Sequence, residues 1–123
     1  MELKLHEKLI FTNDDDLLNT ILVVDEWQMR ILFRVILEAE AGNRAVKDPN
    51  FIKNIQGFME NNKVEAAYFT AVNGNRNVIF ILDMPSADMM PVIAEPFFQM
   101  GASVEFFPTM NFEDLKKGLA AIK

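Results

Sequence analysis

Residues 101–112, GASVEFFPTMNF, decide the fold prediction, because they join a helix end, a strand and a helix start. Gly101 suits the left-handed backbone conformation that ends many helices. The side chains that follow alternate, with Val104 and Phe106 on one side of a strand and Glu105 on the other. Pro108 ends the alternation, and Asn111 is a preferred N-cap for a further helix. The stretch therefore predicts a closing strand between two helices.

Outward from this stretch, the preceding sequence predicts three more strands and two more helices. The strands cover residues 29–38, 64–72 and 76–84, and Asn73-Gly74-Asn75 makes a tight hairpin turn between the last two. One helix begins at Asp48-Pro49 and runs to about residue 62, after a loop with a short helical turn at 40–47. The other ends at Gly101, and Pro96 in its interior is expected to kink it. A terminal helix covers residues 112–122.

This order predicts the fold class. Strand, helix, strand, strand, helix, strand and helix is the order of an α+β, ferredoxin-like βαββαβ core with an added C-terminal helix. Its antiparallel four-stranded sheet has the first and third strands in the centre. Any strand formed further toward the N-terminus is therefore expected to extend an edge of the sheet.

Residues 1–28 are predicted to be an N-terminal extension, and residues 29–123 to be the folded domain. Residues 3–12 can form a short strand. Asn13 and the three aspartates after it are typical of a helix start, and the next apolar residues fit one helix stripe. The alternative is a strand at residues 20–24, because Ile21, Val23 and Val24 are β-branched.

Composition excludes several kinds of partner and chemistry. A net charge of −6 argues against nucleic-acid binding, which needs clustered lysine and arginine. The chain has no cysteine and a single histidine, His6, so no metal site is predicted and no cofactor is expected. Its longest apolar run, near residues 17–24, is too short to cross a bilayer. Without a signal-peptide pattern at the start, the expected location is cytoplasmic, with no membrane partner.

Both faces of the predicted sheet are apolar. One face carries alternate residues such as Ile31, Phe33 and Phe80, which fit beneath the two crossover helices. The other carries Leu32 and Ile81 among others, although no crossover helix can cover it. A second copy of the sheet is the simplest cover, which predicts a homodimer through this face. The alternatives are the N-terminal extension and the terminal helix.

Residues 29–122 resemble an uncharacterised bacterial family of the dimeric α+β barrel superfamily. The resemblance is carried by MRILFRV at 29–35, AGNRAVKD at 41–48, EAAYFTAVNGNRNVIFILD at 65–83 and AEPFFQMGASVEFFPTMNFEDLKKGL at 94–119. That superfamily includes muconolactone isomerases, small cofactor-free monooxygenases and haem-degrading enzymes. The resemblance implies a pocket between sheet and helices, but it does not indicate one reaction. Residues 1–28 fall outside it.

Among the polar residues of the second sheet face, four are candidate site residues: Arg34, Tyr68, Asp83 and Glu105. The strands that carry Asp83 and Glu105 should flank the strand of Arg34. In a functional interpretation, Arg34 binds a carboxylate or carbonyl ligand, Glu105 or Asp83 is a general base, and Tyr68 donates a hydrogen bond. In a structural interpretation, the charges form an ion-pair network at the dimer interface.

Two further groups are candidate ligand contacts. Arg44, in a predicted loop, could bind an anion, but an exposed surface arginine is the alternative. Glu95, Phe97 and Phe98 surround the proline kink, which either opens space for a ligand or fits the helix to a twisted sheet.

Two functions follow as hypotheses. The first is a dimeric α+β barrel that binds a small, partly apolar molecule, with isomerase or cofactor-free oxygenase chemistry if it is an enzyme. The second is a non-catalytic dimerisation or sensor module.

Overall fold

The computed structural model describes the backbone of residues 2–6 and 23–122 and the side chains of residues 29–122. The elements in chain order are β1 (Glu2–His6), β2 (Val23–Leu37), α2 (Ala39–Lys47), α3 (Phe51–Asn61), β3 (Ala66–Val72), β4 (Asn75–Met84), α4 (Met90–Phe98), β5 (Ser103–Pro108) and α5 (Phe112–Ala120). A short 3-10 turn, Ala87–Met89, leads into α4.

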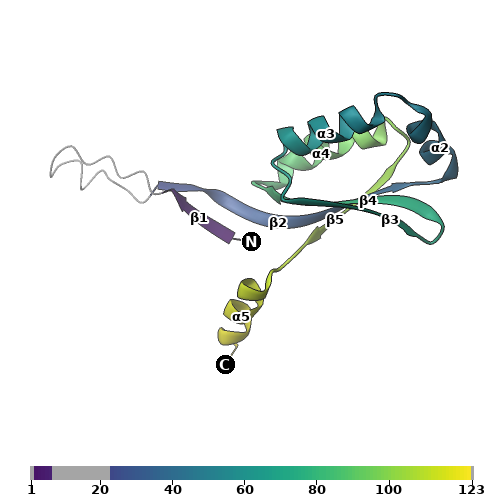
Figure 1. Ribbon diagram of the computed structural model, residues 1–123. Coiled ribbons are helices and arrows are strands. Elements are labelled where there is room, and N and C mark those ends of the chain that lie inside the picture. Colours follow the sequence, from purple (N-terminus) through teal and green to yellow (C-terminus); the bar gives the residue numbers. More distant parts are fainter. Residues whose placement is uncertain (1, 7–22, 123) are drawn as a thin grey trace.

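The central sheet has the predicted topology. Its four strands are ordered β3-β4-β2-β5, and every neighbouring pair is antiparallel. The first and third strands of the core, β2 and β4, are therefore in the middle, as the sequence predicts. Helices α3 and α4 lie side by side over one face of this sheet (Figure 1). The prediction of an α+β fold with an antiparallel four-stranded sheet is confirmed.

The first core strand is longer than its sequence pattern indicated. β2 begins at Val23 and continues without a break past Met29, the predicted domain start. Its first part pairs with β1, from Glu2 opposite Gln28 to His6 opposite Val23. The expectation that an N-terminal strand must extend a sheet edge is therefore wrong. Because β2 runs beyond the part that β4 and β5 flank, β1 can pair with the protruding length (Figure 1).

The predictions for the N-terminal extension concern in part residues that the structure does not describe. The predicted helix after Asn13 lies mostly in residues 7–22, which are outside the described part of the chain. Its last positions, 23–25, are strand, in agreement with the β-branched alternative there.

Two local predictions around α2 and α3 were wrong. Residues 40–47, expected to be a loop with a short helical turn, belong to the nine-residue helix α2. Its buried side consists of the small residues Ala41, Gly42 and Ala45. Helix α3 begins at Phe51 rather than at Pro49. Asp48 instead accepts a hydrogen bond from the Asn50 amide at 2.9 Å, which makes a turn between the helices.

Helix α4 and its end agree with the prediction. Pro96 lies inside the helix, and Ile93 and Phe97 face the core. The chain leaves the helix through Gly101, whose φ of +83° is the left-handed conformation expected there.

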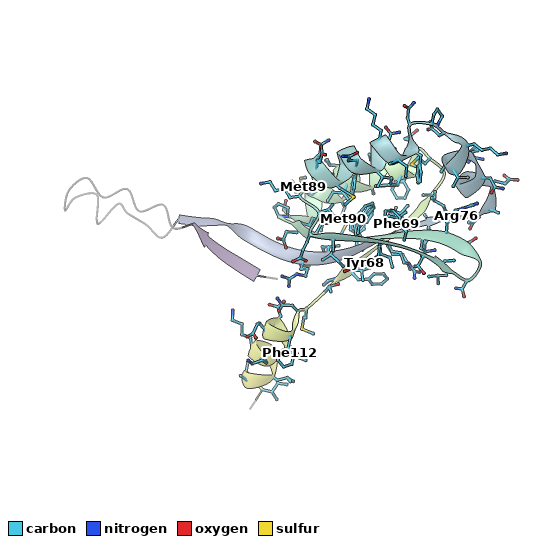
Figure 2. All side chains as sticks on the ribbon, in the orientation of Figure 1. Tyr68, Phe69, Arg76, Met89, Met90 and Phe112 are labelled. Carbon is cyan, nitrogen blue, oxygen red and sulfur yellow. The ribbon has the colours of Figure 1, made fainter. Side chains whose placement is uncertain are left out.

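The two faces of the sheet have different surroundings. Directly opposed residues of paired strands point to the same side, so the register assigns each residue to a face. Residues on the helix-covered face are mostly buried, including Ile31, Phe33, Val35, Leu37, Val78, Phe80 and Leu82. The opposite face, which we call the open face, carries alternate residues: Leu32, Arg34, Ile36, Ala66, Tyr68, Thr70, Asn77, Ile79, Ile81, Asp83, Ser103, Glu105 and Phe107. Tyr68 and Phe69, adjacent on β3, show the two directions (Figure 2).

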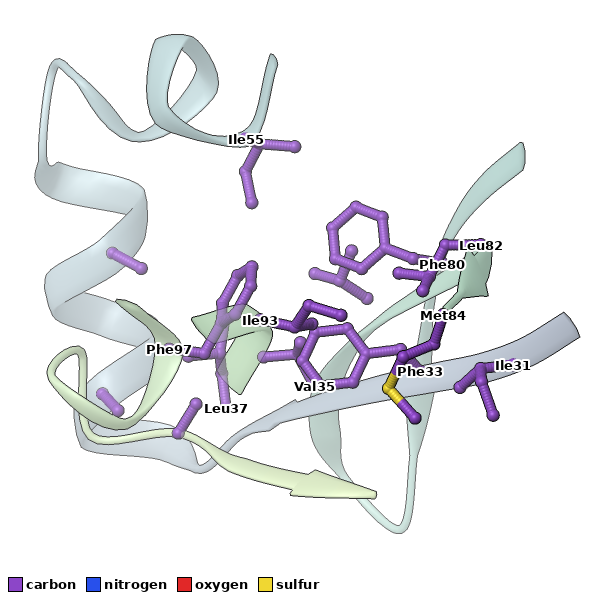
Figure 3. Close-up of a cluster of buried hydrophobic side chains, with 14 residues drawn as sticks. Ile31, Phe33, Val35, Leu37, Ile55, Phe80, Leu82, Met84, Ile93 and Phe97 are labelled. Carbon is purple, nitrogen blue, oxygen red and sulfur yellow. The ribbon is translucent and has the colours of Figure 1, made fainter. Parts of the chain in front are cut away.

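The core between sheet and helices is a cluster of buried apolar side chains that includes the rings of Phe33, Phe80 and Phe97 (Figure 3). Phe33 of β2 is fully buried, and its ring centroid lies 4.7 Å from that of Phe106 and 5.5 Å from that of Phe97. Phe58 of α3 joins them, with its centroid 4.8 Å from that of Phe80. Such centroid distances are typical of favourable aromatic pairs. The ring cluster holds both crossover helices on β2 and β4.

Helix α5 stands apart from this core. It projects on the side of the sheet opposite to α3 and α4 (Figure 1). Asn111 caps it as predicted, in a capping box with Asp114. Its apolar residues, Phe112, Leu115 and Leu119, are all exposed, and Met110 and Ile122 beside it are exposed too. The apolar side of α5 therefore has no cover within the described part of the chain.

Candidate functional site on the open sheet face

One cross-strand row runs through the middle of the open face. Tyr68 of β3 is opposite Ile79 of β4, Ile79 is opposite Arg34 of β2, and Arg34 is opposite Glu105 of β5. This row contains three of the four polar residues that the sequence singled out. The remaining one, Asp83, lies further along β4.

Arg34 and Glu105 form an ion pair. Nη2 of Arg34 contacts Oε1 of Glu105, because the two residues lie directly opposite each other on β2 and β5. The side chains are 28% and 39% exposed, so water screens the pair in the single chain and it adds at most about 1 kcal/mol to stability. Nε of Arg34 is buried and has no hydrogen-bond acceptor among the described residues.

The structure separates the other two predicted members from this pair. Asp83 is opposite Arg30, four residues along β2 from Arg34, which is about 13 Å at ~3.3 Å per residue. Tyr68 is two strands away from Arg34, about 10 Å at ~4.8 Å per strand, with Ile79 between them. The backbone positions of Asp83 and Tyr68 are therefore separated from the Arg34–Glu105 pair. Their catalytic and binding roles stay predictions.

Arg30 is a contact that the sequence reasoning missed. Its Nη1 donates to Oδ2 of Asp114 at 2.9 Å, and its Nε lies 3.5 Å from a carboxylate oxygen of Glu65. The Thr109 amide also donates to the Arg30 carbonyl at 2.9 Å. The bonds with Asp114 and Thr109 fix the start of α5 beside the open face. The sequence holds no local signal that would join Arg30 to Asp114, 84 residues away.

Apolar side chains surround the ion pair. Leu32, Ile36, Ile79 and Ile81 are partly exposed, and Tyr68 and Phe107 are exposed. The described helices α2, α3 and α4 lie on the other face, and α5 stands away from the sheet (Figure 1). An apolar surface of this kind, with a central charge pair and a polar margin, is typical of a protein contact rather than of a surface left in water.

The remaining candidate residues lie elsewhere. Arg44 is on α2, not in a loop; its Nη2 lies beside Gly101, 3.0 Å from where a Cβ would be. It borders a hollow of about 270 Å³ together with Glu38 and Glu40, whose carboxylates weaken any attraction for an anion.

The three candidate residues around Pro96 have different surroundings. Phe97 is part of the buried ring cluster, Phe98 is exposed, and Glu95 accepts a 2.6 Å hydrogen bond from Gln99. The contacts of Phe97 with Phe33 and Phe58 explain the role of that ring in packing. Ligand binding by these residues stays a prediction.

Comparison of the chain with protein-family models, with curated proteins and with solved structures gave no match. The resemblance to the dimeric α+β barrel superfamily therefore stays a prediction, supported by the strand order alone. Among the described residues, no helix has the length and apolar content needed to cross a bilayer.

Proposed function

We propose that the protein acts as a homodimer whose two open faces stack on each other, forming a dimeric α+β barrel. The observation that carries this proposal is the apolar open face, which no described helix covers. The dimer is then the functional unit, and it encloses Arg34 and Glu105 between two sheets.

A second copy fits this surface better than an unrelated partner for two reasons. The single chain presents two uncovered apolar surfaces on the same side, the open face and α5, and a two-fold axis would cover both at once. The charges at the centre of the face also neutralise each other within one chain, since Arg34 pairs with Glu105. Two copies can therefore meet without like charges facing each other.

Sedimentation equilibrium of three proteins tests the proposal. Wild type should have twice the 14.1 kDa chain mass. Ile79→Asp should weaken association at least ~30-fold, because it places an unpaired charge at the centre of the interface. Ile52→Asp is the matched control, since Ile52 is 73% exposed on the helix side of the sheet. This variant should remain a dimer.

Circular dichroism of each variant shows whether it folds. Should Ile79→Asp not fold, Tyr68→Asp serves in its place, because Tyr68 is exposed in the single chain. A monomeric wild type, or a dimer that only Ile52→Asp disrupts, would refute the proposal.

Enzyme chemistry is the second candidate, and the Arg34–Glu105 pair is the observation that favours it. Once a second sheet covers this face, the pair would lie in a space of low dielectric constant, where Glu105 can act as a general base toward a ligand held by Arg34. Isomerase or cofactor-free oxygenase chemistry on a small organic acid is the corresponding proposal. Glu105→Gln should then abolish turnover and leave the dimer intact; retained turnover would rule out this role.

A further inference from the structure

A cavity of about 310 Å³ lies between the β3–β4 hairpin and the junction of α2 and α3; most of its lining belongs to the helix-covered side, and Thr70 and Asn77 line it too. Its apolar lining comes from Leu37, Val46, Phe51, Phe69 and Val78. This volume is at the small end of the range for ligand pockets, roughly 300–1,000 Å³. The cavity is thus large enough for a small molecule and too small for a peptide.

The cavity exists because the hairpin extends beyond the helices. Phe69 is opposite Val78 and therefore points to the helix-covered face, yet it is 61% exposed. Helix α3 begins only at Phe51, and the next apolar side chain above the hairpin is Val46 of α2, which is 55% exposed. Phe69 and Val46 thus line an open space, whereas side chains further along the strands are packed. Two large, exposed apolar side chains around one cavity are an unusual feature of a surface in water.

Arg76 supplies a positive charge to this apolar space. It is opposite Leu37 and Ala71, so it also points to the helix-covered face, and it lines the cavity (Figure 2). Its Nη1 donates to Oδ1 of Asn43 on α2 at 3.2 Å.

Gly42 of α2 leaves space for the side chain of Arg76 beside the helix. A Cβ at Gly42 would lie 2.5 Å from Nη1 of Arg76, so the glycine lets the guanidinium lie against the helix in this position. Among the described residues, Arg76 has no carboxylate within 4.0 Å, in contrast to Arg30 and Arg34. A guanidinium carries five N–H donors in a planar fork that matches a carboxylate, and the contact with Asn43 uses one of them.

From this geometry we propose that the cavity binds a small carboxylate with an aromatic or branched aliphatic body. The carboxylate accepts hydrogen bonds from Arg76, and the body packs between Phe69, Val46 and Phe51. This site goes beyond the proposed dimer: most of its lining belongs to the helix-covered side, and it uses neither Arg34 nor Glu105. The unpaired charge selects an anion, and the apolar walls select against acetate and other anions without an apolar part.

Titration of ¹⁵N-labelled protein with phenylacetate, followed by NMR, tests the proposal. The amide signals of Phe69, Thr70 and Val78 and the side-chain Nε–H of Arg76 should shift together and saturate. Acetate, which lacks the ring, and phenylacetamide, which lacks the charge, should each bind at least ~10-fold more weakly.

Variants separate this site from surface charge and from the dimer. Arg76→Met, which keeps an apolar stem of similar length, should weaken phenylacetate binding at least ~10-fold. Lys53→Met removes the same charge from the exposed surface of α3 and should leave binding unchanged. Ile79→Asp, which tests the dimer, should also leave it unchanged.

Three results would overturn the proposal: no saturable shift with phenylacetate, shifts that map to other residues, or equal binding by wild type and Arg76→Met. Loss of binding in Ile79→Asp alone would place the ligand at the dimer interface and equally refute this site. Phe69→Ala is a second variant should Arg76→Met not fold, and it should weaken binding by removing one wall.

Discussion

The two faces of the one sheet differ in what covers them. On the helix-covered face, Phe33 and Phe80 are sealed beneath α3 and α4 by a cluster of rings. On the open face, side chains of similar apolar character, such as Ile79 and Ile81, remain partly exposed. The alternation of side chains along the strands makes both faces of the sheet apolar, so the role of each face depends on the elements that cover it. The covered face stabilises the single chain, and the open face is available for association.

The largest expected effect on stability comes from a substitution on the helix-covered face. Phe33→Ala should lower the free energy of unfolding by about 3–5 kcal/mol, because it removes a fully buried ring that contacts Phe58, Phe97 and Phe106. Chemical denaturation measures the loss, and Ile52→Ala on the outer surface of α3 should change stability by no more than about 0.5 kcal/mol. Similar losses for the two variants would show that the ring cluster is not the stabilising core.

The next largest effect on stability shows whether a second sheet covers the open face. Arg34→Met leaves the Glu105 carboxylate without its partner. If a second sheet covers the pair, the folded dimer should lose about 3–5 kcal/mol, whereas an exposed pair is worth about 0–1 kcal/mol. Unfolding at several protein concentrations measures the loss.

A matched double variant completes this test. Arg34→Met combined with Glu105→Leu should recover most of the lost stability, because no unpaired charge remains in the interface. A single variant as stable as wild type would mean that the pair stays in water.

The smallest effect concerns the position of α5 beside the open face. Asp114→Asn weakens both the ion pair with Arg30 and the capping box with Asn111, so it should cost about 1 kcal/mol. Thermal unfolding measures this change. The neighbouring Glu113→Gln, which keeps the cap, should cost less; an equal loss would show that general helix-end charge, not the bond to Arg30, accounts for the effect.

The sequence predicted those features that depend on local periodicity or on a single special residue. Alternation gave the correct face for Phe33, Arg34 and Glu105, and Gly101 marked the end of α4 with the expected positive φ. Helix α2 was missed because its buried positions hold alanine and glycine, not the large apolar side chains that mark the other core helices. The length of β2 was missed because its first residues pair with β1, far from the core.

The candidate site was predicted only in part, because strand register is a long-range property. Face assignment placed Arg34, Asp83 and Glu105 together, but no local pattern sets how far β4 slides along β2. In the structure Glu105 is directly opposite Arg34, whereas Asp83 is opposite Arg30. The contact of Arg30 with Asp114 and the cavity at Arg76 likewise depend on elements distant in sequence.

The central claim, that a second copy covers the open face, is tested most directly by isotope-filtered NOE measurements on a mixture of labelled and unlabelled chains. We predict NOEs between chains at the methyl groups of Ile36, Ile79 and Ile81, together with those of Leu115 and Leu119 on α5. Ile52, on the helix side, should show none. Absence of NOEs between chains at the open-face methyl groups, or their appearance at Ile52 instead, would contradict the account.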